Sequence, residues 1–254
     1  MDFGNFDLAV LLPFIAVGFA AQLVDGALGM AFGVISNTLL VAVLGVPPAI
    51  ASQRVHLVEC FTTAMSGISH LLHGNIDKKL FFALLIPGVA GGVLGAYVLT
   101  SLDAGLVKPF VLLYLTAIGI FLLIRGVFYP PKLREAKTIM PLGLIGGFLD
   151  AAGGGGWGPV VTSNLLIQGA DPRKVVGTVN TVEFFLTLTV SAAFIFQLGV
   201  ADVAGATLGL LIGGILAAPI GAWAAKHFPP KQMLILVGVV LTATSAYGVY
   251  RAWF

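Results

Sequence analysis

Long apolar segments run from Leu8 to Phe254, separated by short stretches of Gly, Pro or charged residues. Each segment is roughly 17 to 25 residues long, the length at which an α-helix crosses a lipid bilayer. The chain has room for about ten such segments. This arrangement predicts an all-α integral membrane protein.

The composition agrees with that fold class, because 58% of the residues are hydrophobic and only 9% are charged. Soluble domains carry about 25% charged residues, so no water-soluble fold would hide this much apolar surface. The first seven residues contain two Asp and no Lys or Arg, so they lack the basic region of a cleaved signal peptide. We therefore expect the first apolar segment to remain in the mature protein.

Chemically similar landmarks recur at a nearly constant offset. Asp25 and Asp150 are 125 residues apart, and Glu59 and Glu183 are 124 apart. The offset predicts one transmembrane transport domain over 1–254, made of repeat 1 (about 8–129), a linker (130–137) and repeat 2 (about 138–254). Each repeat holds about five apolar segments, and an odd number reverses the orientation of the second repeat in the membrane. We therefore expect two inverted-topology repeats.

Basic residues are divided unevenly between the two sets of alternate loops. Ten fall on one side: Lys78, Lys79, Arg125, Lys132, Arg134, Lys137, Arg173, Lys174, Lys226 and Lys231. Three fall on the other: Arg54, Lys108 and Arg251. Because cytoplasmic loops are enriched in Lys and Arg, we expect a cytoplasmic linker and both termini outside a bacterial-type inner membrane. Arg125 and Arg251 are expected to be interfacial anchors that snorkel to the membrane surface.

Two glycine-rich stretches, 24–33 and 149–159, occupy equivalent positions near the start of each repeat. Glycine costs about 1 kcal/mol per residue in a helix relative to Ala, so we expect broken or re-entrant helices there, next to Asp25 and Asp150. The N–H groups and positive dipole end of a new half-helix would form an anion site. Ordinary turns outside the membrane, or close helix packing through GxxxG spacing, are the alternatives.

Amides and hydroxyls near these breaks are suited to donate hydrogen bonds to sulfonate or carboxylate oxygens. Hydrogen bonds between helices, worth about 0.6 kcal/mol on average, are the competing interpretation for these side chains. Trp157 would wall or gate the site, or else pack. The predicted substrate-binding residues are Gly29, Gly33, Asn37, Thr38, Gly154, Gly155, Gly156, Trp157, Ser163, Asn164, Thr178 and Asn180.

Pro48 and Pro172 suit the first turn of a helix, and Glu59 and Glu183 each follow 11 residues later. That distance is about 16 Å, near the middle of a hydrocarbon core of about 30 Å. A carboxyl group at that depth is by default a functional hypothesis, so both glutamates are candidates for proton coupling, together with His56. The alternative is a buried Glu that ties helices together. His70 and His73 are three residues apart but lack an HExxH-type context, so no metal is expected.

Together, the Asp25 to Gly33 stretch, its counterpart from Asp150 to Gly158 and the Gly177-Thr178 pair after Pro172 resemble the sulfite exporter TauE/SafE-like family. The resemblance covers essentially the whole chain. The first half departs from the second by having Gln53-Arg54 where the second has Gly177-Thr178. The resemblance implies export of sulfite, sulfoacetate or related organosulfonates.

These features together predict a secondary transporter, most simply an exporter of sulfite, an organosulfonate or a related small organic anion. It would work by alternating access at a midplane site between the repeats, with proton or ion coupling. A passive anion channel and a membrane-embedded subunit of a larger complex are the alternatives. The sequence lacks GxxxxGK[ST], HExxH and GxSxG, so we expect neither an ATPase nor an enzyme, and no cofactor. The expected partners are the small anion and membrane lipid, without nucleic acid; a homo-oligomer remains open.

Overall fold

The computed structural model describes residues 8–28, 30–128, 137–168, 170–199, 203–227 and 230–253. These residues form ten α-helices and two π-helical segments, with no strand among them. The expected all-α fold class is confirmed. The predicted linker falls almost wholly in 129–136, which lies outside the described residues.

The N-terminal half contains a long helix, a short broken segment and three further long helices. They are α1 (Leu8–Leu28), α2 (Phe32–Thr38), η1 (Leu39–Val43), α3 (Pro48–Leu72), α4 (Lys78–Ser101) and α5 (Ala104–Val127). The C-terminal half shows a similar order: α6 (Met140–Gly153), η2 (Trp157–Thr162), α7 (Ser163–Gln168), α8 (Pro172–Leu198), α9 (Val203–His227) and α10 (Pro230–Trp253). The division into two related halves and their inverted relation both stay predictions.

Local sequence signals set several of these helix starts. Pro48 and Pro172 are the first residues of α3 and α8, as predicted from the tolerance of a helix for proline in its first turn. Asp77 caps α4, and its Oδ1 accepts hydrogen bonds from the backbone N–H groups of Lys79 and Leu80 at 2.9 and 3.1 Å. Asp103 caps α5 in the same way.

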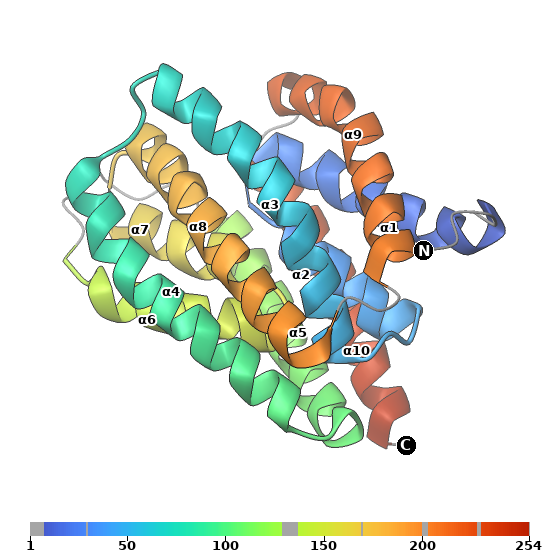
Figure 1. Ribbon diagram of the computed structural model, residues 1–254. Helices are drawn as coiled ribbons and strands as arrows, with labels where there is room; N and C mark the ends of the chain where they lie inside the picture. The colour runs from blue at the N-terminus through green and yellow to red at the C-terminus, as the bar shows by residue number, and fades with distance from the viewer. Residues whose placement is uncertain are drawn as a thin grey trace.

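Long helices from the two halves pack against each other in pairs. α1 lies along α9, α4 along α6, α5 along α10 and α3 along α8, and the last pair crosses the centre of Figure 1. Small residues allow the close approach of these backbones. A Cβ at Gly147, for example, would collide with the Gly88 carbonyl across the contact between α6 and α4. The protein is therefore held together largely by contacts between its halves.

Three of the described helices are long and apolar enough to cross a membrane: Lys78–Ser101, Ala104–Val127 and Lys174–Leu198. The segments after the breaks are shorter, since 32–43 and 157–168 contain 12 residues each. Twelve helical residues span at most about 18 Å, less than a hydrocarbon core of about 30 Å. A Cβ at Gly146 would collide with Val161, so η2 folds back along α6. This segment is re-entrant in shape.

Candidate functional site

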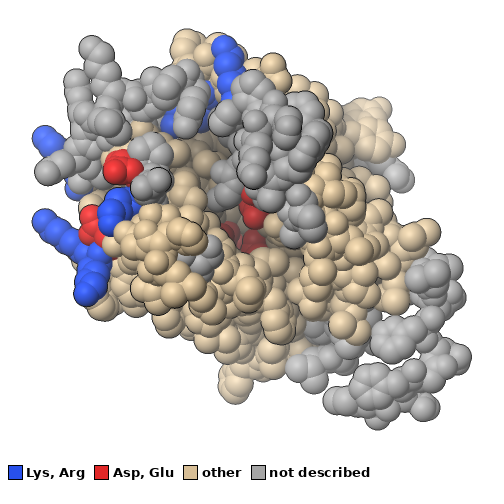
Figure 2. All heavy atoms as spheres, turned by 90° about the horizontal axis from the view of Figure 1, so that it is seen from above, with Lys and Arg blue, Asp and Glu red and all other residues tan. Residues whose placement is uncertain are grey.

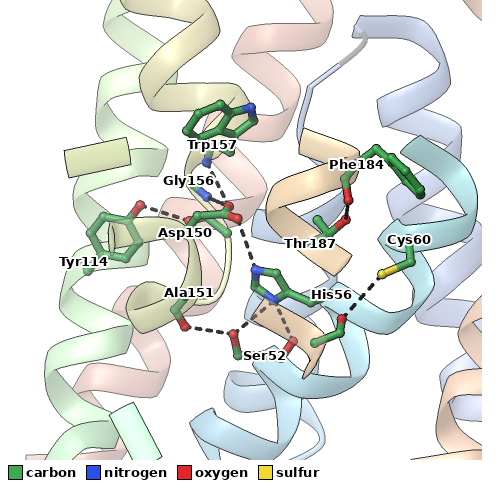
Figure 3. A network of polar contacts seen from close by, with 12 residues as sticks. Ser52, His56, Cys60, Tyr114, Asp150, Ala151, Gly156, Trp157, Phe184 and Thr187 are labelled. Carbon is green, nitrogen blue, oxygen red and sulfur yellow. Dashed lines mark hydrogen bonds and ion pairs between the residues drawn. The ribbon is translucent and has the colours of Figure 1, made fainter. Parts of the chain in front are cut away.

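The break after α6 is organised by the carboxylate of Asp150. Its Oδ1 accepts hydrogen bonds from the backbone N–H groups of Gly156 and Trp157 at 2.8 and 2.9 Å (Figure 3). Gly154 and Gly155 turn the chain with φ values of 74° and 126°, which side chains with a Cβ rarely adopt. A carboxylate suits the positive end of a helix dipole, so Asp150 stabilises the start of η2.

The break after α1 has a similar arrangement. Oδ1 of Asp25 accepts a hydrogen bond from the backbone N–H of Phe32 at 3.2 Å. Phe32 follows Asp25 by seven residues, as Trp157 follows Asp150. In both halves the acidic residue before the glycines therefore holds the first residue of the next helix.

The two breaks meet inside the protein. A Cβ added to Gly33 would lie 3.2 Å from Cα of Gly155 and 2.9 Å from Oε1 of Glu59. A Cβ added to Gly158 would lie 2.9 Å from Cβ of Met30. Backbone therefore touches backbone, and side chains larger than hydrogen are excluded from this contact.

A cavity of about 280 Å³ opens beside this contact. Seven predicted residues line it: Asp25, Gly33, Glu59, Asp150, Gly156, Asn180 and Glu183. They come from α1, α2, α3, α6, the second break and α8. The view from above in Figure 2 shows a hollow with acidic side chains in its depth.

The cavity is acidic. Four carboxyl groups line it, and no Lys or Arg does so among the described residues. Glu59 is only 5% exposed. The N–H groups of Gly156 and Trp157, which were expected to face an anion, are occupied by Asp150. The hydroxyl groups of Thr62 and Thr63 donate to the Glu59 carbonyl of their own helix, which leaves the Ser66 hydroxyl as a donor at the cavity.

A family model described as sulfite exporter TauE/SafE matches residues 14–248. The chain belongs to this family. The resemblance found in the sequence is thereby confirmed, and the chain is a member of a family of membrane transporters.

Individual relatives of this TauE/SafE chain are also described as membrane transporters or members of this family. It is 46% identical over 252 residues to "Probable membrane transporter protein YtnM" of Bacillus subtilis, covering 96% of this chain and 84% of that one. It is 23% identical over its full length to "Probable membrane transporter protein" of Haemophilus influenzae, covering 99% of that chain. A 120-residue stretch, 46% of this chain, is 28% identical to 25% of "Sulfite exporter TauE/SafE family protein 3" of Arabidopsis thaliana. No solved structure matches.

Several other predicted residues of this TauE/SafE protein lie beside the cavity without lining it. Asn37 and Thr38 are fully buried, and their polar side-chain atoms have no hydrogen-bond partner among the described residues. The Asn37 amide lies directly over Gly154, where a Cβ would overlap it. Gly155 lies in the same turn and accepts a hydrogen bond from the Tyr114 hydroxyl at 2.9 Å. These residues shape the break.

The remaining predicted residues make contacts within the protein. The indole N–H of Trp157 donates to the Val179 carbonyl at 3.2 Å, and the buried ring packs against Gly88. Ser163 donates to Sδ of Met30. Asn164 donates to its own helix, at the Val160 carbonyl, and Thr178 accepts from the Asp77 backbone N–H at 2.8 Å. Gly29 lies outside the described residues.

Two further positions were not anticipated. Ser66 and His70 line the cavity, and Ser66 accepts a hydrogen bond from the Asn180 amide at 3.1 Å. Ser66 follows Glu59 by seven residues, two helical turns along the same face, so extending the polar stripe would have found it.

One expectation needs correction. Arg125 is 7% exposed, and its guanidinium donates to the Ser163 carbonyl at 3.4 Å, so it is no snorkelling anchor. Tight packing of α5 against its neighbours encloses it. The side chain of Arg251 lies outside the described part.

Proposed function

We propose that this TauE/SafE protein is a secondary transporter that exports a small anion, sulfite or an organosulfonate, by alternating access. The cavity carries the proposal, because residues before and after the linker share its walls and the two breaks meet at its edge. Sites between matched halves, at discontinuous helices, are the usual construction of secondary transporters. Rocking one half against the other would expose this site to each side in turn.

The size of the cavity favours a small solute. Its volume of about 280 Å³ is just below the 300 to 1,000 Å³ typical of sites for drug-sized ligands. Ser66 and Asn180 offer a hydroxyl and an amide donor around it. These groups would bind the oxygen atoms of a sulfite, sulfonate or carboxylate ion.

The acidic lining adds a requirement for protons. Two like charges 4 Å apart repel by about 4 kcal/mol at an effective dielectric constant of 20. An anion would therefore bind only when Glu59, Glu183 and Asp25 carry protons, and the protonated groups would then donate hydrogen bonds. Anion binding and proton binding would then favour each other, and both glutamates keep their proposed role in proton coupling.

The cavity opens beside the basic end of the protein. Its lining extends along α3 from Glu59 to His70 in the last turn and includes Val176 near the start of α8. Lys174 donates to the Gly74 carbonyl at 2.8 Å next to this mouth. Under the positive-inside rule this is the cytoplasmic side, so the conformation is inward-open. An exporter would load its substrate in this state.

Purified protein in liposomes tests the proposal. Thermal unfolding with sulfite, thiosulfate, sulfoacetate, taurine and small carboxylates identifies ligands first, since specific ligands stabilise by mass action. Labelled ligand is then followed in both directions across the vesicle membrane. Saturable flux with counter-transport supports a transporter, and uncoupled conductance favours the channel. Stabilisation by amines or metal cations alone would overturn the anion assignment and favour a cationic substrate, which the acidic lining also suits.

A further inference from the structure

A buried polar cluster lies where α3 of the first half meets the break of the second half (Figure 3). Nε2 of His56 lies 3.1 Å from Oδ2 of Asp150. The imidazole is completely buried and the carboxylate nearly so. Ser52, one turn before His56, donates its hydroxyl hydrogen to the Ala151 carbonyl at 2.9 Å, which adds a second link between the halves.

The contacts of the ring fix the number of protons that this cluster holds. Nδ1 of His56 lies 2.8 Å from the Ser52 carbonyl, which can only accept, so Nδ1 carries a hydrogen. The Ser52 hydroxyl, 3.3 Å from Nδ1, has given its hydrogen to Ala151 and also presents a lone pair. Nδ1 therefore donates its hydrogen to the Ser52 carbonyl. A hydrogen bond between Nε2 and Asp150 needs a second proton.

That second proton lies between Nε2 of His56 and Oδ2 of Asp150. Without it, a nitrogen lone pair would face a carboxylate oxygen at 3.1 Å in a buried site. Oδ1 of Asp150 is already committed to the Gly156 and Trp157 N–H groups, so the carboxylate cannot turn away without releasing η2. The pair therefore has no net charge: it is either an imidazolium beside a carboxylate or a neutral imidazole beside a protonated carboxyl group.

We propose that the His56–Asp150 pair is the coupling proton site of this protein, binding the proton whose loss accompanies separation of α3 from the second break. The proposal rests on the transport function above. On release, the N–H bond at Nε2 breaks, its electrons stay on nitrogen, and the proton passes to a carboxylate or water in the cavity. The products are a neutral imidazole with Nδ1–H and a carboxylate, which no longer attract each other.

The proton has a route to the cavity. Asp150 itself lines the cavity, together with Glu59 on α3, Glu183 on α8 and Asp25 on α1. Cys60 on α3 contacts the Ser191 hydroxyl. Tyr114 on α5 donates its hydrogen to Gly155. The carboxyl groups are thus the acceptors available to the shared proton.

The other break has no such pair. At the offset of 124 that relates Glu59 to Glu183, the residue equivalent to His56 is Asn180. Its amide donates to Ser66 and has no proton to exchange near neutral pH. The described structure therefore places the pair at one break, which gives one coupling proton from this cluster per transport cycle.

The transport test uses His56→Gln in proteoliposomes, with His73→Gln, a histidine in the loop after α3, as the matched control. Glutamine keeps an N–H donor for Asp150 and removes the exchangeable proton. We expect His56→Gln to keep exchange of labelled sulfite across the membrane, while sulfite-driven proton movement, read with a pH-sensitive dye, falls about tenfold or more. His73→Gln should retain both. Proton movement at the control level in His56→Gln overturns the proposal.

A spectroscopic measurement decides the proton count without transport. Protein labelled with ¹⁵N-histidine is compared with the His56→Gln variant to assign the ring signals. At the pH of the transport assay we expect either two protonated ring nitrogens on His56 or a protonated carboxyl band in the infrared that disappears in Asp150→Asn. A neutral ring beside an ionised Asp150 overturns the proposal. If wild-type protein fails to move sulfite, the anion assignment fails, and these spectra still decide the pair.

Discussion

At the scale of single residues, glycines are required for different physical reasons, as Gly155 in the second break and Gly45 show. Gly155 has a φ of 126°, and its hydrogen faces the backbone of Gly33 and Val34. Gly45 also has a positive φ, 71°, but nothing lies within 4 Å of the position of its missing Cβ. At Gly45 a side chain would therefore meet only backbone strain, whereas at Gly155 it would meet both backbone strain and a steric clash.

Gly155→Ala should destabilise the protein much more than Gly45→Ala. Placing Ala at a positive φ costs about 1–2 kcal/mol, and collision with a packed backbone adds about 1–3 kcal/mol. We expect Gly45→Ala to show only the first of these and Gly155→Ala their sum, measured by thermal unfolding in detergent. Equal losses of stability would show that the two breaks do not touch.

Glu59→Gln should strengthen anion binding under alkaline conditions. In the wild type, a rise in pH ionises the carboxyl groups of the cavity, and repulsion lowers anion affinity. Glutamine removes one such charge, so affinity at alkaline pH should rise about tenfold, with a flatter pH profile. Equilibrium binding at two pH values measures this, with Asp103→Asn at the cap of α5 as a remote control. Weaker binding by Glu59→Gln at both pH values would indicate that the carboxylate itself contacts the substrate.

The helices could be predicted from sequence to different degrees. Long apolar segments gave α4, α5 and α8 directly, because a bilayer-length run of apolar residues has few other structures available. Pro48 and Pro172 located the starts of α3 and α8. The glycine runs located the breaks. The fold-back of η2 along α6 was left open, since it depends on a contact between Gly146 and Val161 that no local pattern encodes.

Gly88→Leu should separate α4 from the second break. A Cβ at Gly88 would lie 2.7 Å from the Trp157 ring, and Trp157 also anchors η2 through its backbone N–H. We expect a loss of about 1–3 kcal/mol from overpacking and weaker ligand stabilisation in thermal unfolding. Ala90→Leu, on the exposed face of the same helix, is the control. Unchanged ligand stabilisation in Gly88→Leu would mean that Trp157 can move without disturbing the cavity.

For the protein as a whole, the residues that line the candidate site could be predicted from the sequence, but their hydrogen-bond partners could not. The matched offset brought Asp25, Asp150, Glu59 and Glu183 together, and all four line one cavity. The occupation of the Gly156 and Trp157 N–H groups by Asp150 was not foreseen, because the sequence does not show whether an acidic side chain before a break turns to cap the next helix or leaves its N–H groups free. The His56 contact joins residues 94 apart.

The orientation of the cavity can be tested by labelling. Cys60 is the single cysteine, so Cys60→Ser provides a cysteine-free background in which Ser66→Cys reports on the cavity. We expect a membrane-impermeant thiol reagent to modify Ser66→Cys from the cytoplasmic side of oriented vesicles and not from the outside. Cysteine in place of Ser101, at the end of α4, should react from the outside. The opposite pattern would reverse the assignment of sides.

The contact of Gly33 with Gly155 has a consequence for motion. Interlocked side chains would have to change rotamers and open gaps each time one half slid past the other, and each step would add to the activation barrier. Two bare stretches of backbone present smooth surfaces instead. If the halves move as proposed, the contact between the two breaks would therefore let backbone slide along backbone without rearrangement of side chains.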